Sequence, residues 1–162
     1  NYKGSYNFCY CTKCNHFSHV VNEALKHKVN LETSSSYDID LILNLFKDKK
    51  IDTNRTIVHN GYKTEDYLTK IIALQEIGFK NNIIVLDSIN ELKRIEKLAN
   101  GAKVKIGIRM AINEESQSSY YTSRLGIRNT KILDFFNKNI KGKSNIELKM
   151  LHFFINTGIM DI

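Results

Sequence analysis

The stretch from Phe8 to Leu25 reads Phe-Cys-Tyr-Cys-Thr-Lys-Cys-Asn-His-Phe-Ser-His-Val-Val-Asn-Glu-Ala-Leu, and it contains the step from a strand to a helix that decides the fold. Phe8 to Thr12 is rich in aromatic and other β-prone residues, which is typical of a strand. Helical spacing follows, with apolar side chains at Phe17, Val20, Val21, Ala24 and Leu25 and Asn15 as the expected cap. Lys13 therefore lies at the carboxyl end of a predicted strand, where α/β folds gather ligands and catalytic groups.

The same alternation continues along the chain. Apolar, β-branched runs predict further strands over 29–33, 56–59, 83–86, 104–112 and 148–155. The intervening helices are predicted after Ser34-Ser35-Ser36, after Thr64 as a cap, after Ser88 with Glu91 as a capping box, and over 130–140. Gly78 and Asn100-Gly101 are expected to end two of them. Strands separated by helices pair in parallel through right-handed crossovers.

Two architectures satisfy this pattern, an open doubly wound sheet and a (β/α)8 barrel of the TIM type. No glycine-rich nucleotide fingerprint follows the first predicted strand, which favours the barrel. A complete barrel has eight strands and about 250 residues, whereas this chain offers about six strands. We therefore predict an α/β fold in which residues 1–162 form the N-terminal part of a barrel whose closing strands are absent.

Composition limits the classes of function. The chain has 162 residues, of which 42% are hydrophobic, and it contains no apolar run near the ~20 residues that span a bilayer and no signal peptide pattern. We therefore expect a cytoplasmic protein without a membrane partner. The net charge of +7 comes from lysines scattered beside acidic residues rather than from a basic cluster, so no nucleic-acid partner is expected.

Polar and ionisable residues occupy the carboxyl ends of successive predicted strands. They are Lys13, Glu32, the segment His59–Lys63, Asp87, Arg109 and the segment 152–158. Because parallel strands end at the same edge of a sheet or barrel, these groups are expected to converge on one rim.

Several motifs, all in the same order, carry a resemblance to a known family. They are Tyr10–Asn15, Leu31–Ser35, Asn60–Lys63, Ile106–Arg109, Thr122–Gly126 and Leu151–Gly158. Together they resemble the biosynthetic arginine decarboxylases. These belong to the group of alanine-racemase-fold (fold type III) decarboxylases that depend on pyridoxal 5'-phosphate and that also act on ornithine and diaminopimelate.

The resemblance implies roles for individual residues. Lys13 matches the lysine that holds the cofactor covalently, and Glu32 matches an acidic residue near the cofactor. Arg109 and Arg124 fall in motifs on the same rim, although structural ion pairs would give the same sequence pattern. Phe154 stands where relatives place a histidine on the cofactor ring, which keeps aromatic stacking but not proton transfer. Thr157 stands where relatives have a serine.

The resemblance also implies what this chain lacks. The glycine-rich phosphate loop, the acidic partner of the pyridine nitrogen, the substrate-reading residues and the C-terminal β domain of the family would all follow Ile162. We therefore expect the isolated fragment to be inactive and its full-length parent to be a homo-oligomer.

His152 shares a strand face with Phe154 and is interpreted as a packed core histidine.

The resulting prediction is a fragment of a decarboxylase that converts arginine to agmatine and carbon dioxide in polyamine and spermidine biosynthesis. Ornithine or diaminopimelate as the substrate remains open, as does a pyridoxal-phosphate-binding protein with a similar barrel and no decarboxylase activity. An alternative of another class is a zinc-stabilised binding module, because Cys9, Cys11, Cys14 and His16 give four possible ligands in one short segment.

Overall fold

The computed structural model describes residues 3–111 and 125–154. The chain consists of two compact units, Asn1–Ile83 and Ile84–Ile162. In both units, strands alternate with helices as the sequence predicts, and the pairs β1–β2, β2–β3, β5–β6 and β5–β7 are parallel. Strand β4 (Asn82–Leu86) crosses the boundary between the units.

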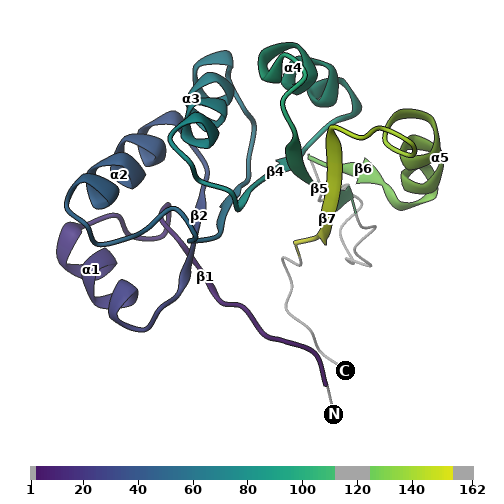
Figure 1. Cartoon of the computed structure of the whole chain (residues 1–162). Coiled ribbons are helices and arrows are strands. Elements are labelled where there is room, and N and C mark those ends of the chain that lie inside the picture. Colours follow the sequence, from purple (N-terminus) through teal and green to yellow (C-terminus); the bar gives the residue numbers. More distant parts are fainter. Residues whose placement is uncertain (1–2, 112–124, 155–162) are drawn as a thin grey trace. The chain divides into compact units, whose positions relative to one another are not determined.

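The first unit contains β1 (Cys9–Cys11), α1 (Ser18–Lys26), β2 (Asn30–Thr33), α2 (Ser36–Lys47), β3 (Ile57–His59) and α3 (Glu65–Glu76). Strand β2 lies between β1 and β3, with Cys11 opposite Glu32 and Thr33 opposite His59. The three helices lie on one side of β1 and β2 (Figure 1). The carboxyl ends of β1, β2 and β3 therefore meet at one edge, as predicted.

The core of the first unit fixes this edge. Leu31 and Ile57 are partners on β2 and β3 and are fully buried. Ile42 of α2 and Leu68 of α3 are also fully buried. Each buried side chain of this size contributes about 1.5–3 kcal/mol. The apolar residues that produce the predicted helical and strand periodicity are thus the ones that position the strand ends.

The second unit contains α4 (Ile89–Ala99), β5 (Val104–Ala111), β6 (Ile127–Arg128), α5 (Asn129–Asn139) and β7 (Ile146–His152). Strand β5 pairs with β6 and also with β7. A Cβ atom at Gly107 would lie 2.7 Å from Cγ of Met150, so the Met150 side chain of β7 packs directly over this glycine of β5 and would have to shift for a larger residue. The two-residue strand β6 was not predicted, because two residues give no periodicity to detect.

One predicted helix cap, at Asn15, and one predicted capping box, at Ser88 and Glu91, are wrong. Asn15 does not cap α1, because its carboxamide oxygen accepts a hydrogen bond from the Phe17 N–H at 3.0 Å, before the helix begins. Ser88 is the N-cap residue of α4 but makes no side-chain cap bond. Glu91 instead accepts a hydrogen bond from the Asp87 N–H at 2.8 Å, so its carboxylate ties the end of β4 rather than completing a capping box.

The predicted final strand is also placed incorrectly. Strand β7 begins at Ile146 and ends at His152, so Phe154 follows the strand and its side chain is 57% exposed. His152 is half-buried at the end of β7, and its Nδ1 atom is buried. The last predicted strand residue, Ile155, lies outside the described residues.

The described helices are all too short or too polar to cross a bilayer.

Candidate active site around Lys13

Lys13 lies in a turn directly after β1. The Cys14 N–H donates to the Cys11 carbonyl at 3.1 Å and closes this turn. Thr12, which is fully buried, attaches the turn to β2 because its N–H and its hydroxyl both donate to the Glu32 carbonyl, at 2.9 and 3.0 Å. The Lys13 side chain is exposed, and it makes no hydrogen bond or ion pair with any described residue.

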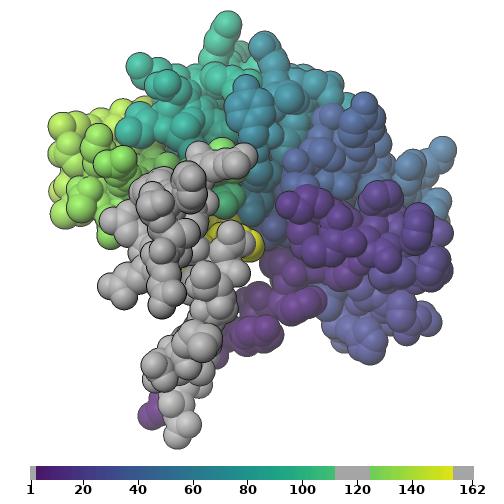
Figure 2. Space-filling view, turned by 180° about the vertical axis from the view of Figure 1, so that it is seen from behind, coloured from purple at the N-terminus to yellow at the C-terminus, as the bar shows by residue number. Residues whose placement is uncertain are grey.

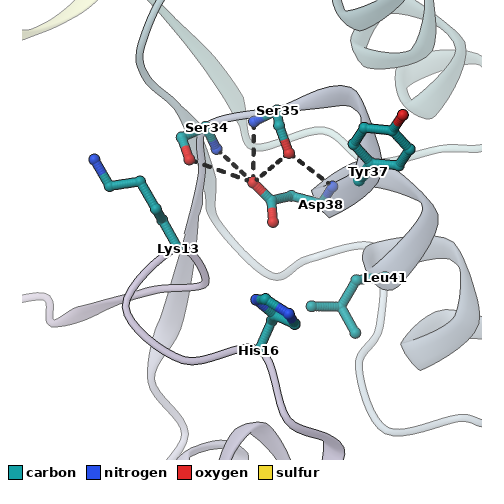
Figure 3. A pocket seen from close by; sticks show the side chains of 7 residues that line it. All are labelled: Lys13, His16, Ser34, Ser35, Tyr37, Asp38 and Leu41. Carbon is teal, nitrogen blue, oxygen red and sulfur yellow. Dashed lines mark hydrogen bonds between the residues drawn. The ribbon is translucent and has the colours of Figure 1, made fainter.

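A cavity of about 610 Å³ opens beside this lysine. Ligand sites in proteins commonly have volumes of about 300–1,000 Å³. The cavity lies between the Lys13 turn and the start of α2 (Figure 3), and it is lined by Lys13, His16, Ser34, Ser35, Tyr37, Asp38 and Leu41. The structure therefore places an unengaged amine on the wall of a ligand-sized cavity at a strand end.

The opposite wall is a capping box that the sequence reasoning did not identify. Ser35 is the N-cap of α2, and its hydroxyl accepts a hydrogen bond from the Asp38 N–H at 3.4 Å. One carboxylate oxygen of Asp38 accepts in return from the N–H groups of Ser34 and Ser35, at 2.8 and 3.0 Å. The signal was available as Ser-x-x-Asp before an apolar run, with Asp in the place of the usual Glu.

Asp38 is buried, with 8% of its surface exposed, and its two carboxylate oxygens differ. The side-chain hydrogen bonds of Ser34 and Ser35 and those of their N–H groups all reach Oδ2, whereas Oδ1 has no hydrogen-bond partner among the described residues. Figure 3 shows this second oxygen directed away from the two serines, and the Lys13 amine pointing away from Asp38. The cavity therefore presents an acceptor oxygen and an amine that do not neutralise each other.

Glu32 lies beside the cysteines of β1 rather than on the cavity wall. It is the partner of Cys11 in the strand register, and its carboxylate accepts a hydrogen bond from the Asn60 carboxamide at 3.4 Å. Burial raises the pKa of the Cys9 thiol, and the charge of Glu32 raises it further. Glu32 thus adds a negative charge beside the thiols of β1, the strand that precedes Lys13.

A buried polar network follows β2 and β3. The Thr33 hydroxyl lies 2.7 Å from His59 Nδ1 and 2.6 Å from the Tyr67 hydroxyl. Burial lowers the pKa of His59 to about 3, the Asn82 side chain opposes this shift, and the charge of Lys63 adds to it. His59 is therefore a neutral imidazole near neutral pH, with one nitrogen that donates and one that accepts.

Lys63 is fully buried in the same unit. Its amine donates a hydrogen bond to the Gly61 carbonyl at 2.7 Å. Gly61 has a φ of +76°, a conformation that favours glycine and lets the loop after β3 fold back. The sequence predicted that the His59–Lys63 segment lies at a strand end. It did not predict that the side chains of His59 and Lys63 would be buried.

Arg109 lies on β5 in the second unit and forms an ion pair with Asp87, with 3.7 Å between Nη1 and Oδ1. The two side chains are only 15% and 3% exposed. Arg109 Nε is buried and makes no hydrogen bond with any described residue. The structure thus gives Arg109 an ion-pair role and leaves one buried donor for a further partner.

The structure describes one of the three remaining predicted site residues. Phe154 is exposed just beyond β7. Arg124 and Thr157 lie outside the described residues.

The structure gives no support to a zinc site at the N-terminal cysteines. Within residues 3–111 and 125–154, no group of three or more His, Cys, Asp or Glu side chains is arranged to hold a metal ion. Cys9 and Cys11 are half-buried on β1, whereas Cys14 is exposed. The four candidate ligands therefore do not converge.

Parallel strands joined by helices, with a lysine amine at a strand end, define the class of protein as an α/β fold that forms part of an alanine-racemase-like barrel. Solved structures share this fold. Diaminopimelate decarboxylase of Helicobacter pylori, complexed with L-lysine, superposes with a TM-score of 0.73 at 22% identity, over 95% of this chain and 39% of that one. Biosynthetic arginine decarboxylase of Campylobacter jejuni gives 0.68 at 24% identity, over 94% and 24%.

Residues 1–162 match the family of pyridoxal-dependent decarboxylases, in its pyridoxal binding domain, and the chain belongs to this family. A biosynthetic arginine decarboxylase of Prochlorococcus marinus is 30% identical over 174 residues, which cover 100% of this chain and 26% of that protein. The chain thus spans about a quarter of the length of such relatives, and pyridoxal phosphate is the cofactor of its family.

The described residues fit this cofactor. A pyridoxal aldehyde requires an amine that other side chains do not engage, and Lys13 meets that requirement. A phosphate group requires hydrogen-bond donors, and Arg109 retains a buried Nε for which the described residues supply no acceptor. Lys13 belongs to the first unit and Arg109 to the second, so each of these two observations stands by itself.

Proposed function

We propose that this chain is the N-terminal part of the pyridoxal-phosphate-binding barrel of an arginine decarboxylase, which converts arginine to agmatine and carbon dioxide. The observation that carries the proposal is the unengaged amine of Lys13 at the end of β1, beside a ligand-sized cavity. Family membership and full-chain similarity to biosynthetic arginine decarboxylases support it. Polyamine and spermidine biosynthesis in the cytoplasm would be the setting of this reaction.

Lys13 is the proposed catalytic residue that holds the cofactor covalently. Its amine makes no hydrogen bond or ion pair with any described residue, so it is available to react with an aldehyde. When bound, pyridoxal phosphate supplies an electron sink for the electron pair that remains after carbon dioxide leaves. The protein would orient the bond that breaks, and the turn after β1 would hold the Lys13 amine beside the cofactor.

The other proposed cofactor contacts are Glu32, Arg109, Arg124, Phe154 and Thr157. The arginines offer guanidinium donors for an anionic group, and Thr157 offers a hydroxyl. Phe154 can stack against an aromatic ring but cannot move a proton, so any proton transfer at that face must come from another group. We propose a small-molecule amino-acid substrate, no nucleic-acid or membrane partner, and a homo-oligomeric full-length protein.

The proposal is tested with the full-length protein, as wild type, Lys13→Ala and a control variant, Lys47→Ala. Lys47 is an exposed lysine of α2, the helix whose start lines the cavity. After addition of pyridoxal phosphate and borohydride reduction, we expect peptide mapping to find the label on Lys13 in wild type and Lys47→Ala, and the site-specific label to be lost in Lys13→Ala. Label spread evenly over surface lysines would contradict the proposal.

Substrate choice is a separate measurement. Release of carbon dioxide from arginine, ornithine and diaminopimelate by the loaded full-length protein would be compared. We expect arginine to give the highest kcat/KM, and Lys13→Ala to abolish turnover of all three. The fragment of residues 1–162 alone is expected to release no carbon dioxide, because most of the length of its relatives is missing from it.

A further inference from the structure

Two of the cysteines flank the proposed catalytic lysine at a redox-motif spacing. The sequence Cys11-Thr12-Lys13-Cys14 is a Cys-x-x-Cys motif with Lys13 as one of the two middle residues. All three cysteines of the chain are free thiols. The proposed decarboxylase mechanism uses none of them, and they form no metal site with other side chains in the part of the chain that the structure describes.

The turn brings Cys11 and Cys14 within the range of a disulfide. The Cys14 N–H donates to the Cys11 carbonyl at 3.1 Å, which is the bond of a four-residue turn. The first and last Cα atoms of such a turn lie within about 7 Å, and disulfides join Cα atoms that are about 4.4–6.8 Å apart. The backbone therefore needs little movement to join the two sulfur atoms.

The two thiols also interact and differ in exposure. Burial raises the pKa of the Cys11 thiol most, and the charges of Glu32 and Cys14 raise it further, so the sulfur of Cys14 is close enough to act on that of Cys11. Cys14 is exposed whereas Cys11 is half-buried. An external reagent therefore reaches Cys14 first, and Cys11 is positioned to react second.

Cys9 is a poor competitor for this bond. Cys9 and Cys11 are alternate residues of β1, so they point to the same face. Their side chains are separated by about 6.6 Å along the strand, which exceeds the Cβ separation of about 3.5–4.5 Å in disulfides. Of the two possible partners of Cys11, Cys14 is therefore the geometrically suitable one.

We propose that Cys11 and Cys14 form a reversible disulfide that fixes the turn carrying Lys13 and slows covalent attachment of the cofactor. The oxidant is a low-molecular-weight disulfide. The Cys14 thiolate attacks one of its sulfur atoms, a mixed disulfide forms, and one small thiol leaves. The Cys11 thiolate then attacks Cys14 Sγ, and the second small thiol leaves. The protein gives up two protons and two electrons in total, and the oxidant is reduced to two thiols.

The turn's attachment explains why this bond would affect Lys13. Thr12 is already held by two hydrogen bonds to the Glu32 carbonyl. A Cys11–Cys14 bond would fix the other side of the same turn and leave the Lys13 backbone little freedom. The amine must move from its exposed position to the cofactor and back, so a fixed turn slows it. This effect on attachment rests on the proposed function, whereas the disulfide itself does not.

The first test maps the disulfide in the full-length protein. Wild type, Cys9→Ser, Cys11→Ser and Cys14→Ser would be incubated with oxidised and reduced glutathione at varied ratios and digested without reduction. We expect a Cys11–Cys14 linked peptide in wild type and in the matched control Cys9→Ser, and glutathione retained on Cys14 in Cys11→Ser. A disulfide that includes Cys9, or glutathione retained on Cys14 in wild type, would overturn the proposal.

The second test measures Lys13 in each redox state. We expect the rate of borohydride-fixed labelling by pyridoxal phosphate at Lys13 to fall several-fold in oxidised wild type and Cys9→Ser, to recover with dithiothreitol, and to be independent of glutathione oxidation in Cys14→Ser. Acylation of Lys13 by a small amine-reactive reagent, which reaches the exposed amine without movement to a cofactor site, should keep the same rate in both redox states. Equal rates of labelling by pyridoxal phosphate in both redox states would overturn the effect on Lys13.

The outcomes separate the two proposals. If pyridoxal phosphate labels Lys13 in neither state while the linked peptide forms, the proposed function and the effect on attachment fail and the reversible disulfide stands. If Lys13 is labelled but no linked peptide forms, the switch fails and the proposed function stands.

Discussion

Two lysines in the first unit follow strands β1 and β3 and lie in opposite surroundings. Lys13 is exposed beside a cavity and engages no described residue. Lys63 is fully buried, and its amine donates to the Gly61 carbonyl. Position at a strand end, which drew attention to both in the sequence, therefore does not separate a chemical role from a structural one. The surroundings of the amine do.

The difference arises from the loops that carry them. The turn of Lys13 is attached through buried Thr12, and the residues on either side of that anchor can project outward. The loop of Lys63 turns back at Gly61, where φ is +76°. That turn brings the Lys63 side chain into the interior of the first unit, where neutral His59 is also buried. We infer that Lys63 stabilises the strand ends, whereas the Lys13 amine remains available for the chemistry proposed above.

Substitution by alanine should separate the two lysines most strongly. Lys63→Ala empties a fully buried site, and changes of this kind cost about 2–5 kcal/mol. Lys13→Ala removes an exposed side chain and should change stability by less than about 0.5 kcal/mol. Hydrogen exchange of peptides that span β3 and α3 in the full-length protein would measure the local free energy of opening.

A volume-conserving variant controls for the size of the cavity. Lys63→Met keeps most of the side-chain volume but removes the amine, so it should cost less than Lys63→Ala. A Lys13→Ala variant that opens β3 and α3 as readily as Lys63→Ala does would contradict the division of roles.

The buried neighbour of Lys63 should make stability depend on pH. His59 has a pKa of about 3 when folded, against 6.5 as its ordinary value, so the unfolded chain takes up a proton first as the pH falls. Stability from this residue is complete above pH 6.5 and is lost toward pH 3, at about 1.4 kcal/mol per pH unit. Between pH 6.5 and pH 4.5 the loss is therefore about 2–3 kcal/mol.

His59→Gln isolates this contribution, because glutamine keeps a donor and an acceptor but does not titrate in this range. Denaturant unfolding of the full-length protein at several pH values should give a flatter curve for the variant than for wild type. The same slope in both would assign the acid sensitivity to other groups.

The fold was largely predictable from the sequence because its signals are local and repeated. Buried residues such as Ile42 and Leu68 recur at helical spacing, and Leu31 and Ile57 lie in short β-branched or apolar runs. The short strand β6 was missed because its two residues are defined by pairing with β5, which is a tertiary property. The capping errors at Asn15 and Ser88 have a similar cause, since each depends on which nearby N–H a side-chain oxygen reaches.

The site was predictable in part. The position of Lys13 at a strand end follows from periodicity, and the cavity beside it could be expected from that edge. The burial of Lys63 and His59 could not, because a charged or titratable side chain gives no sequence signal for a buried site. Arg109 illustrates the same limit, because its ion pair with Asp87 joins residues that are distant in the sequence.

The smallest of these effects concerns the wall opposite Lys13. Ser35→Ala removes the N-cap hydroxyl of α2 and should cost about 1 kcal/mol, whereas Ser36→Ala, in the first turn of the same helix, should cost little. The backbone N–H groups of Ser34 and Ser35 still hold Asp38, at 2.8 and 3.0 Å, so the cavity wall should remain. Labelling of Lys13 by pyridoxal phosphate should therefore be unchanged in both variants, while hydrogen exchange at the start of α2 rises in Ser35→Ala alone. Equal exchange in the two variants would show that the capping box does not stabilise this wall, and a loss of labelling in Ser35→Ala would show that the hydroxyl itself serves the site.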